Sequence, residues 1–238
     1  MQVQVISNIT KVYPTMIKVI IYKQPLINTL SDCDRSRRKV RSDEDILPSY
    51  RSLRRSRTSI KDIIYSNKFD LFCTFTFDPK KHDRYNISYC KLVMLKWFRN
   101  QKQKHSPHLK YICIPELHKD GAVHFHALIA NFNGRLKDSG HKTKQGSIIY
   151  NLTGYRAGLS TASPLDGNID GVANYVAKYV TKGLVSSFNH KRYFCSRNLS
   201  RPVKIRNSSL FKNTLPLFRK QIADFDNIQI YDLQKFYV

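Results

Sequence analysis

Two histidines, His124 and His126, are separated by one apolar residue, Phe125, and an apolar run follows them. Side chains alternate between the two faces of a β-strand, so both imidazoles would project from one face and Phe125 from the other. Two neutral imidazoles about 6 to 7 Å apart along a strand can share a divalent cation. The alternative is that they are polar residues on the solvated face of a half-buried sheet.

A third ligand is available in the preceding strand, where Glu116 stands before the turn sequence "HKDG". A hairpin loop with an odd number of residues, for instance 120–122, would place Glu116 opposite His126 on the same face. An even loop would place it on the face of Phe125. Gly121 suits the left-handed residue of a three-residue loop, which favours the odd count. Two histidines and a glutamate suit Mg²⁺ or Mn²⁺ acting on a phosphate, or Zn²⁺. The alternative is that Glu116 is a surface carboxylate at a strand end.

Two tyrosines follow later in the chain, each at the start of a similar tetrapeptide. Tyr175 and Tyr179 are four residues apart and would share one face of a helix. A phenol is a competent nucleophile toward phosphate when a metal polarises the phosphoryl oxygens. Lys178 and Lys182 are placed to hold an anionic phosphate or to favour the phenolate. The alternative for such a tyrosine pair is core packing.

The elements that must position these residues are indicated by periodicity. A β-branched and aromatic run predicts a strand over 69–79, and helical spacing predicts a helix with a basic outer face over 86–104. Residues 109–117 and 123–130 read as the two strands of a hairpin. The tyrosines lie in a helix predicted over 170–183.

Both helices carry end signals. Asn86 or Ser88 can cap the first helix at its N-terminus. Asp170 is the expected N-cap of the second helix, and Gly183 stands where a terminating glycine belongs.

The rest of the chain gives weaker signals. Residues 1–66 are expected to form a basic N-terminal arm, partly disordered or with peripheral strands, because 34–59 is charged and serine-rich. Residues 67–205 are expected to form the catalytic domain, and 206–238 a C-terminal tail. Long connections around one strand are expected over 131–168.

The charge of the chain indicates its partner. The 238 residues carry 41 Lys+Arg against 17 Asp+Glu, a formal net charge of +24, which points to a polyanion and foremost to nucleic acid. The basic residues chosen as candidate nucleic-acid contacts are Lys119, Arg192, Arg197 and Arg201. An anionic membrane surface is the weaker alternative, because no long amphipathic basic helix is evident.

No signal peptide or membrane span is expected. The longest N-terminal apolar run, 16–22, contains a lysine and is far too short to cross a bilayer. The five cysteines are scattered and never stand in Cys-x-x-Cys spacing, which favours free thiols in a reducing cytosol over disulfides or a zinc finger.

Three segments together, "LFCTFTF", "ELHKDGAVHFHALI" and "NYVAKYVTKG", resemble the ordered motifs of HUH endonucleases. They look most like the rolling-circle replication initiators of small bacteriophages and plasmids. The resemblance implies an α+β domain in which an antiparallel sheet of the RRM or ferredoxin-like kind is flanked by α-helices. It also implies nicking of single-stranded or origin DNA by tyrosine, with a 5′-phosphotyrosine intermediate and a free 3′-hydroxyl.

The resemblance also sets expectations about partners. No Gly-x-x-x-x-Gly-Lys-[Ser/Thr] motif is present, so unwinding and synthesis are expected from a host helicase and polymerase in the cytoplasm of a bacterial cell. One alternative is a transposase or mobilisation relaxase with the same site. The other is a non-catalytic basic DNA-binding module in which the histidines and tyrosines are incidental.

Overall fold

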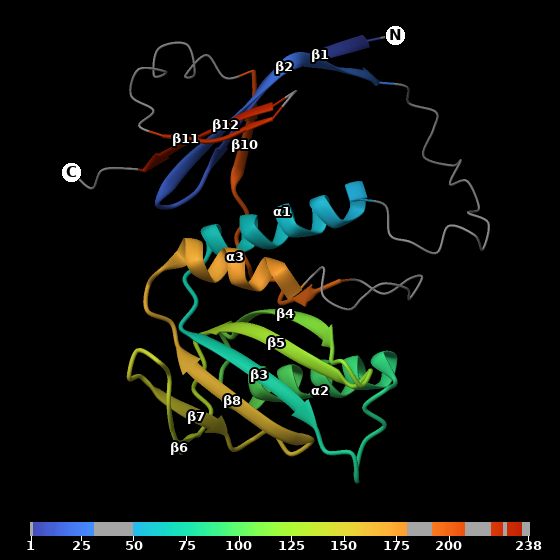
Figure 1. The fold of residues 1–238 in the computed structure, drawn as a ribbon, viewed down its shortest axis with the longest axis vertical. Helices are drawn as coiled ribbons and strands as arrows, with labels where there is room; N and C mark the ends of the chain where they lie inside the picture. Colours follow the sequence, from blue (N-terminus) through green and yellow to red (C-terminus); the bar gives the residue numbers. More distant parts are fainter. Residues whose placement is uncertain (1, 31–49, 180–191, 208–219, 226–227, 235–238) are drawn as a thin grey trace. The chain divides into compact units, whose positions relative to one another are not determined.

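The chain divides into two compact units in the computed structural model (Figure 1). One unit is Asp45–Ser200, and the other combines Met1–Glu44 with Arg201–Val238. The expected α+β class with antiparallel sheets is confirmed. No helix within the described ranges is long and apolar enough to cross a membrane. The structure describes residues 2–30, 50–179, 192–207, 220–225 and 228–234.

The Asp45–Ser200 unit contains an antiparallel sheet in the order β6-β7-β8-β3-β5-β4-β9. Its strands are β3 (Leu71–Phe77), β4 (Lys110–Leu117), β5 (Val123–Ala130), β6 (Leu136–Lys142), β7 (Ile148–Leu152), β8 (Gly158–Pro164) and β9 (Phe194–Cys195). Its helices, in the described part of the unit, are α1 (Tyr50–Ser66), α2 (Ile87–Lys104) and α3 (Ile169–Tyr179).

The two faces of this sheet differ because side chains alternate along β3. On one face, the Phe75 ring packs against Trp97 and Phe98 of α2, with ring centroids 5.0 and 6.2 Å apart. On the other face, the Phe72 ring lies 5.5 Å from that of Tyr175 on α3. Figure 1 shows α2 on one side of the sheet and α3 with α1 on the other. The α2 face is the apolar core, which leaves the α3 face for polar chemistry.

The predicted elements around the motifs are confirmed. β3, β4 and β5 fall within the predicted strands, β4 and β5 pair as a hairpin, and α2 covers the predicted helix. Asn86 caps α2 by accepting a hydrogen bond from the backbone N–H of Tyr89.

The start of α3 differs from the prediction by two residues. Asn168 is the N-cap, since its Oδ1 accepts from the N–H of Gly171 at 2.9 Å. Asp170 was the predicted cap, and it lies instead in the first turn, where its carboxylate accepts from the Tyr65 hydroxyl at 2.5 Å. Both residue types cap helices well, so the local sequence did not discriminate between them. Gly183 lies outside the described residues.

The segment 131–168 is richer in strands than expected. It supplies β6, β7 and β8, and β8 pairs along the whole of β3. β8 has the sequence GLSTASP, whose small polar residues and terminal proline carry little strand preference. Its pairing with β3 outweighs that local preference.

The second unit is a sheet in the order β10-β1-β2-β12-β11. Its strands are β1 (Gln2–Val12), β2 (Met16–Leu30), β10 (Val203–Arg206), β11 (Lys220–Phe225) and β12 (Ile228–Gln234). The predicted division at 66 and 205 is therefore corrected. The N-terminal strands pair with strands from the predicted tail, and such pairing between distant segments leaves no local signal.

The charged segment predicted as part of the arm is helical where it is described. Residues 31–49 lie outside the described part, and residues 50–59 form the first half of α1. The second half of α1 buries Ile60, Ile63 and Ile64 almost completely. This apolar stripe makes α1 part of the Asp45–Ser200 unit.

Cutting the chain inside α1 is expected to destabilise the fold. A chain that begins at residue 61 loses Ile60 and leaves six residues of α1, too few for a stable helix. Each buried isoleucine contributes roughly 1.5–3 kcal/mol. We expect residues 61–238 to lack a cooperative thermal transition by circular dichroism, whereas residues 45–200 unfold cooperatively. A native-like transition in the shorter chain would contradict this role of α1.

Candidate active site

The two histidines occupy the polar face of the sheet, as their spacing predicts. On β5 they are flanked by two threonines of β3. The Nδ1 of His126 lies 3.2 Å from the Thr74 hydroxyl, and the Nδ1 of His124 lies 3.3 Å from the Thr76 hydroxyl. These contacts fix the plane of each imidazole and leave each Nε2 for other partners.

Glu116 lies on the same face, as the odd loop count predicts, but its register is different. It pairs with His124 rather than with His126. The loop consists of 119–121 rather than 120–122, and Gly121 takes a φ of 84° at its third position. Three-residue hairpin loops place the left-handed residue there, so the glycine sets the register. The predicted pairing opposite His126 is therefore wrong.

Glu116 nevertheless reaches His126 diagonally across the sheet. Its Oε2 is 2.6 Å from His126 Nε2, and both side chains are largely buried, 20% and 9% exposed. Two acceptors cannot approach this closely without a proton between them, so the contact holds one shared proton. A cation bound by both groups would replace that proton, which links metal binding to proton release.

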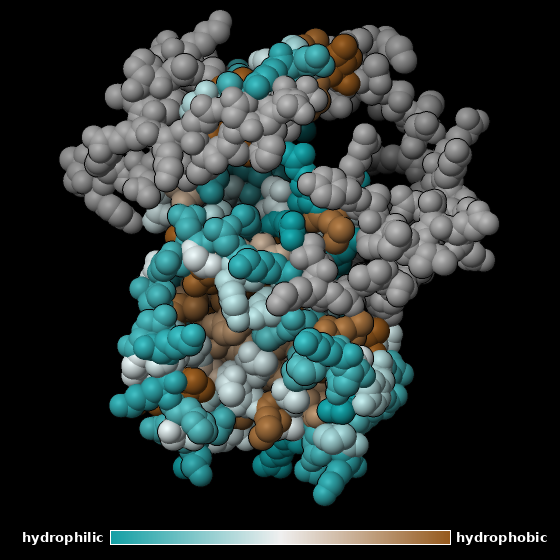
Figure 2. All heavy atoms as spheres, in the orientation of Figure 1, coloured by the Kyte–Doolittle hydropathy of each residue, from teal (hydrophilic) through white to brown (hydrophobic). Residues whose placement is uncertain are grey.

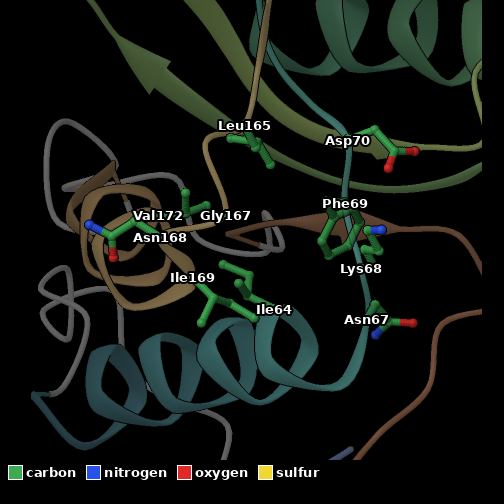
Figure 3. A pocket seen from close by; sticks show the side chains of 10 residues that line it. All are labelled: Ile64, Asn67, Lys68, Phe69, Asp70, Leu165, Gly167, Asn168, Ile169 and Val172. Carbon is green, nitrogen blue, oxygen red and sulfur yellow. The ribbon is translucent and has the colours of Figure 1, made fainter. Parts of the chain in front are cut away.

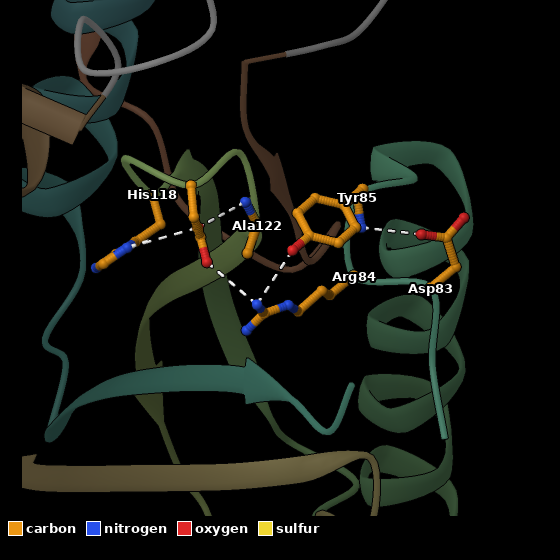
Figure 4. Close-up of polar contacts among 6 residues, drawn as sticks. Asp83, Arg84, Tyr85, His118 and Ala122 are labelled. Atoms are coloured by element: carbon orange, nitrogen blue, oxygen red, sulfur yellow. Dashed lines mark hydrogen bonds and ion pairs between the residues drawn. The ribbon is translucent and has the colours of Figure 1, made fainter. Parts of the chain in front are cut away.

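A third histidine, His118, extends this cluster toward the hairpin turn (Figure 4). Its ring stacks on that of His124 with centroids 5.0 Å apart. Its Nδ1 lies 3.6 Å from Asp120, whose carboxylate also accepts from Arg84 at 3.1 Å. Sequence reasoning missed His118, although the same two-residue alternation that places Glu116 on this face places His118 there too.

The two tyrosines meet each other above the histidines. The Tyr179 hydroxyl donates to the Tyr175 hydroxyl at 2.5 Å, and the two rings are 5.2 Å apart at nearly a right angle. The Tyr179 ring stacks on the His126 imidazole with centroids 3.9 Å apart. The helical spacing and the strand alternation thus bring the tyrosine and histidine motifs into direct contact.

The two phenols have different surroundings. Tyr179 is 7% exposed, whereas Tyr175 is 49% exposed. Burial first, and then the hydrogen bond to Tyr175 and the nearby Glu116 carboxylate, hold the pKa of Tyr179 well above its usual value. Tyr175 is therefore the phenol open to a polymer substrate, and Tyr179 is the one that supports it.

Helix α1 holds α3 in this position. The Lys61 ammonium donates to Asn174 at 2.7 Å, and Tyr65 donates to Asp170. On the inner side of α3, Val176 and Ala177 are buried. The tyrosines are thus presented by a helix that is fixed on both sides.

The lysine predictions are only partly described. Lys178 is exposed in the last turn of α3, next in sequence to Tyr179. Lys182 lies outside the described residues. The position of Lys178 suits a contact with the phosphate that a tyrosine attacks.

The predicted nucleic-acid contacts do not form one surface. Lys119 and Arg197 are exposed in the Asp45–Ser200 unit, and Arg201 is exposed in the other unit. Arg192 donates to two serine hydroxyls of α1 at 2.8 and 3.3 Å, which gives it a role in packing. In the view of Figure 2, hydrophilic side chains cover much of the visible surface of the Asp45–Ser200 unit.

The donors suit a divalent cation, although they are not drawn together around a common point. Within the ranges described, no three His, Cys, Asp or Glu side chains are grouped closely enough to hold a metal ion. Imidazole nitrogens and a carboxylate oxygen are nevertheless ligands that Mn²⁺ and Zn²⁺ accept, and Mg²⁺ takes the carboxylate. His124, His126 and Glu116 therefore fit such a cation by chemistry and by shared face.

Acid is expected to inhibit any reaction that needs these imidazoles as ligands. Burial, and next the neighbouring His118, lower the pKa of His124 below its ordinary value of 6.5, so its ring is neutral at pH 7. A lowered histidine pKa keeps the ligand form available until the pH falls below 6.5, where protons displace the cation. We expect the cleavage rate to be level between pH 7 and 8 and to fall below about pH 6. A rate that rises with acid would contradict this assignment.

Comparison with known proteins places the site in a family context. The family model described as replication-associated protein ORF2 matches residues 70–184. That range begins just before β3 and contains the histidines, Glu116 and both tyrosines. No curated protein and no solved structure matches the chain. The similarity is therefore to replication-associated proteins, over the part of the chain that carries the site.

Proposed function

We propose that this chain is a rolling-circle replication initiator of the HUH type, which nicks single-stranded or origin DNA and rejoins it through tyrosine. The observation that carries the proposal is the packing of Tyr179 on His126, with Tyr175 hydrogen-bonded beside it. A non-catalytic DNA-binding module gives no reason for two tyrosines to meet a histidine pair. The match to replication-associated proteins over residues 70–184 supports replication as the setting.

The reaction is a transesterification at one phosphate of the DNA. The phenolic oxygen of a tyrosine forms a bond to phosphorus, and the bond from phosphorus to the 3′-oxygen breaks. The phenol gives up its proton, and the leaving 3′-oxygen takes one up. The products are a 5′-phosphotyrosine and a free 3′-hydroxyl, from which a host polymerase extends.

The residues of the chain divide the work of orienting these groups. Tyr175 presents its exposed oxygen, and the hydroxyl of Tyr179 donates to it and holds its direction. Lys178 is positioned to hold the phosphate. A divalent cation held by His124, His126 and Glu116 would polarise the phosphoryl oxygens.

The second tyrosine suits a second transfer. Once one tyrosine carries the 5′ end, the other is a free nucleophile on the same helix face, about 6 Å along the helix axis. Alternation between the two would close one strand while another is cut. We place this activity in the cytoplasm of a bacterial host, whose helicase separates the strands.

The proposal is tested by the polarity of covalent attachment. Single-stranded oligonucleotides of random sequence are labelled at either end and incubated with the protein and Mn²⁺ or Mg²⁺. We expect a 3′-terminal label to migrate with the denatured protein and a 5′-terminal label to leave on the free 3′-hydroxyl fragment. Chelation with EDTA should abolish both. Attachment through the 5′-labelled fragment, or cleavage without attachment, would overturn the proposal.

A further inference from the structure

A cavity of about 370 Å³ opens one helical turn before Tyr175, on the same side of the sheet as α3 (Figure 3). Its walls come from the C-terminal end of α1, the segment that leads into β3, and the loop before α3. The residues that line it are Ile64, Asn67, Lys68, Phe69, Asp70, Leu165, Gly167, Asn168, Ile169 and Val172. All of them belong to the Asp45–Ser200 unit.

The cavity has an apolar interior and a polar rim. Figure 3 shows the side chains of Ile64, Leu165 and Ile169 directed toward one another, with the Phe69 ring beside them. The exposed side chains of Lys68, Asp70 and Asn168 stand around this centre. Such a lining favours a ligand with flat apolar faces and a hydrogen-bonding edge.

The charges around the cavity argue against a phosphate as its occupant. Lys68 is accompanied by the carboxylate of Asp70 in the lining, and Asp170 adds a negative charge in the first turn of α3. The helix N-terminus is already capped by Asn168. A neutral, planar, polar-edged group is better matched to this balance than an anion.

The position of the cavity relates it to the tyrosines. Val172 in its wall is three residues from Tyr175, a rise of about 5 Å along α3. Asp70 in its rim is two residues from Phe72, whose ring contacts that of Tyr175. This separation corresponds to about two nucleotides at the spacing of 3.4 Å per residue of one DNA strand. A strand whose phosphate lies at Tyr175 therefore brings a neighbouring base to the cavity.

We propose that this cavity binds one unpaired nucleobase of the single strand that the tyrosines cut. The inference rests on the proposed function for the identity of the strand, and it adds a base-binding site next to the scissile phosphate. Insertion of a base anchors the strand, so that the backbone at Tyr175 is held in one register. An isolated base that inserts among apolar and aromatic side chains contributes substantially to single-strand binding.

The test measures binding in EDTA, where no cleavage is expected, so it is independent of catalysis. The probes are single strands of about 16 nucleotides, one pool with random bases and one made wholly of abasic residues. Ile169→Trp and, separately, Leu165→Trp fill the cavity from two sides. Leu92→Trp is the matched control, because Leu92 is 66% exposed on α2, on the other side of the sheet.

We expect the wild-type protein to prefer the base-containing strand, and each filled variant to lose about tenfold of that preference. Affinity for the abasic strand should be the same in all four proteins, and Leu92→Trp should match the wild type throughout. Full preference in both filled variants would overturn the inference. Equal loss for both strands, or no preference in the wild type, would also overturn it. A protein that shows the expected pattern but forms no covalent adduct with Mn²⁺ would retain the base site and lose the proposed function.

Discussion

Tyr175→Phe combined with Tyr179→Phe is expected to eliminate the covalent protein–DNA adduct altogether. Both changes remove only an oxygen, and the rings that contact Phe72 and His126 remain. The fold and the affinity for single-stranded DNA should therefore be preserved. An adduct that persists in the double variant would mean that the nucleophile lies elsewhere in the chain.

The single variants are expected to differ, because the two phenols have different surroundings. Tyr179→Phe removes the hydrogen bond to Tyr175, a loss of about 1 kcal/mol or roughly fivefold in the rate of adduct formation. Tyr175→Phe leaves only the buried phenol, whose misplacement is expected to lower the rate about 100-fold. Single-turnover adduct formation on one oligonucleotide measures both. A larger loss for Tyr179→Phe would reverse the assigned roles.

His124→Ala and His126→Ala are expected to lower the rate of adduct formation by about 1,000-fold or more, because the cation's stabilisation of phosphoryl charge is worth several kcal/mol. Affinity for single-stranded DNA should change little, since most of it comes from Lys and Arg contacts with phosphates. The loss should persist at saturating Mn²⁺.

His141→Ala provides the matched control for the histidine variants. His141 is exposed on β6, at the edge of the sheet remote in strand order from β5. It should cleave at the wild-type rate. Equal losses of binding and cleavage in the β5 variants would show instead that those histidines serve the fold.

The sequence predicted the local elements of the site better than the long-range pairings. Strand alternation placed His124, His126 and Glu116 on one face, and helical spacing placed Tyr175 and Tyr179 on another. These features depend on residues a few positions apart. The contact between the two motifs was implied only by the family resemblance, because nothing local specifies which face α3 covers.

The errors have physical reasons of the same kind. The hairpin register was displaced because Gly121 was assigned to the second loop position, whereas its φ of 84° belongs to the third. The Asp45–Ser200 boundary was missed because half of α1 is rich in Arg and Ser, and its burial is concentrated in Ile60, Ile63 and Ile64. The tail was missed because β12 is stabilised by pairing with β2, some 200 residues earlier.

Mass spectrometry of the adduct tests the central claim most directly, because it identifies the atom that attacks. Trypsin cuts after Lys178, so Tyr175 falls in the peptide 157–178 and Tyr179 in the peptide 179–182. After digestion of the DNA, we predict a nucleotide mass on tyrosine in the first peptide early in the reaction and in both peptides at later times. A nucleotide on any other peptide, or on neither of these under conditions where DNA is cut, would contradict the account.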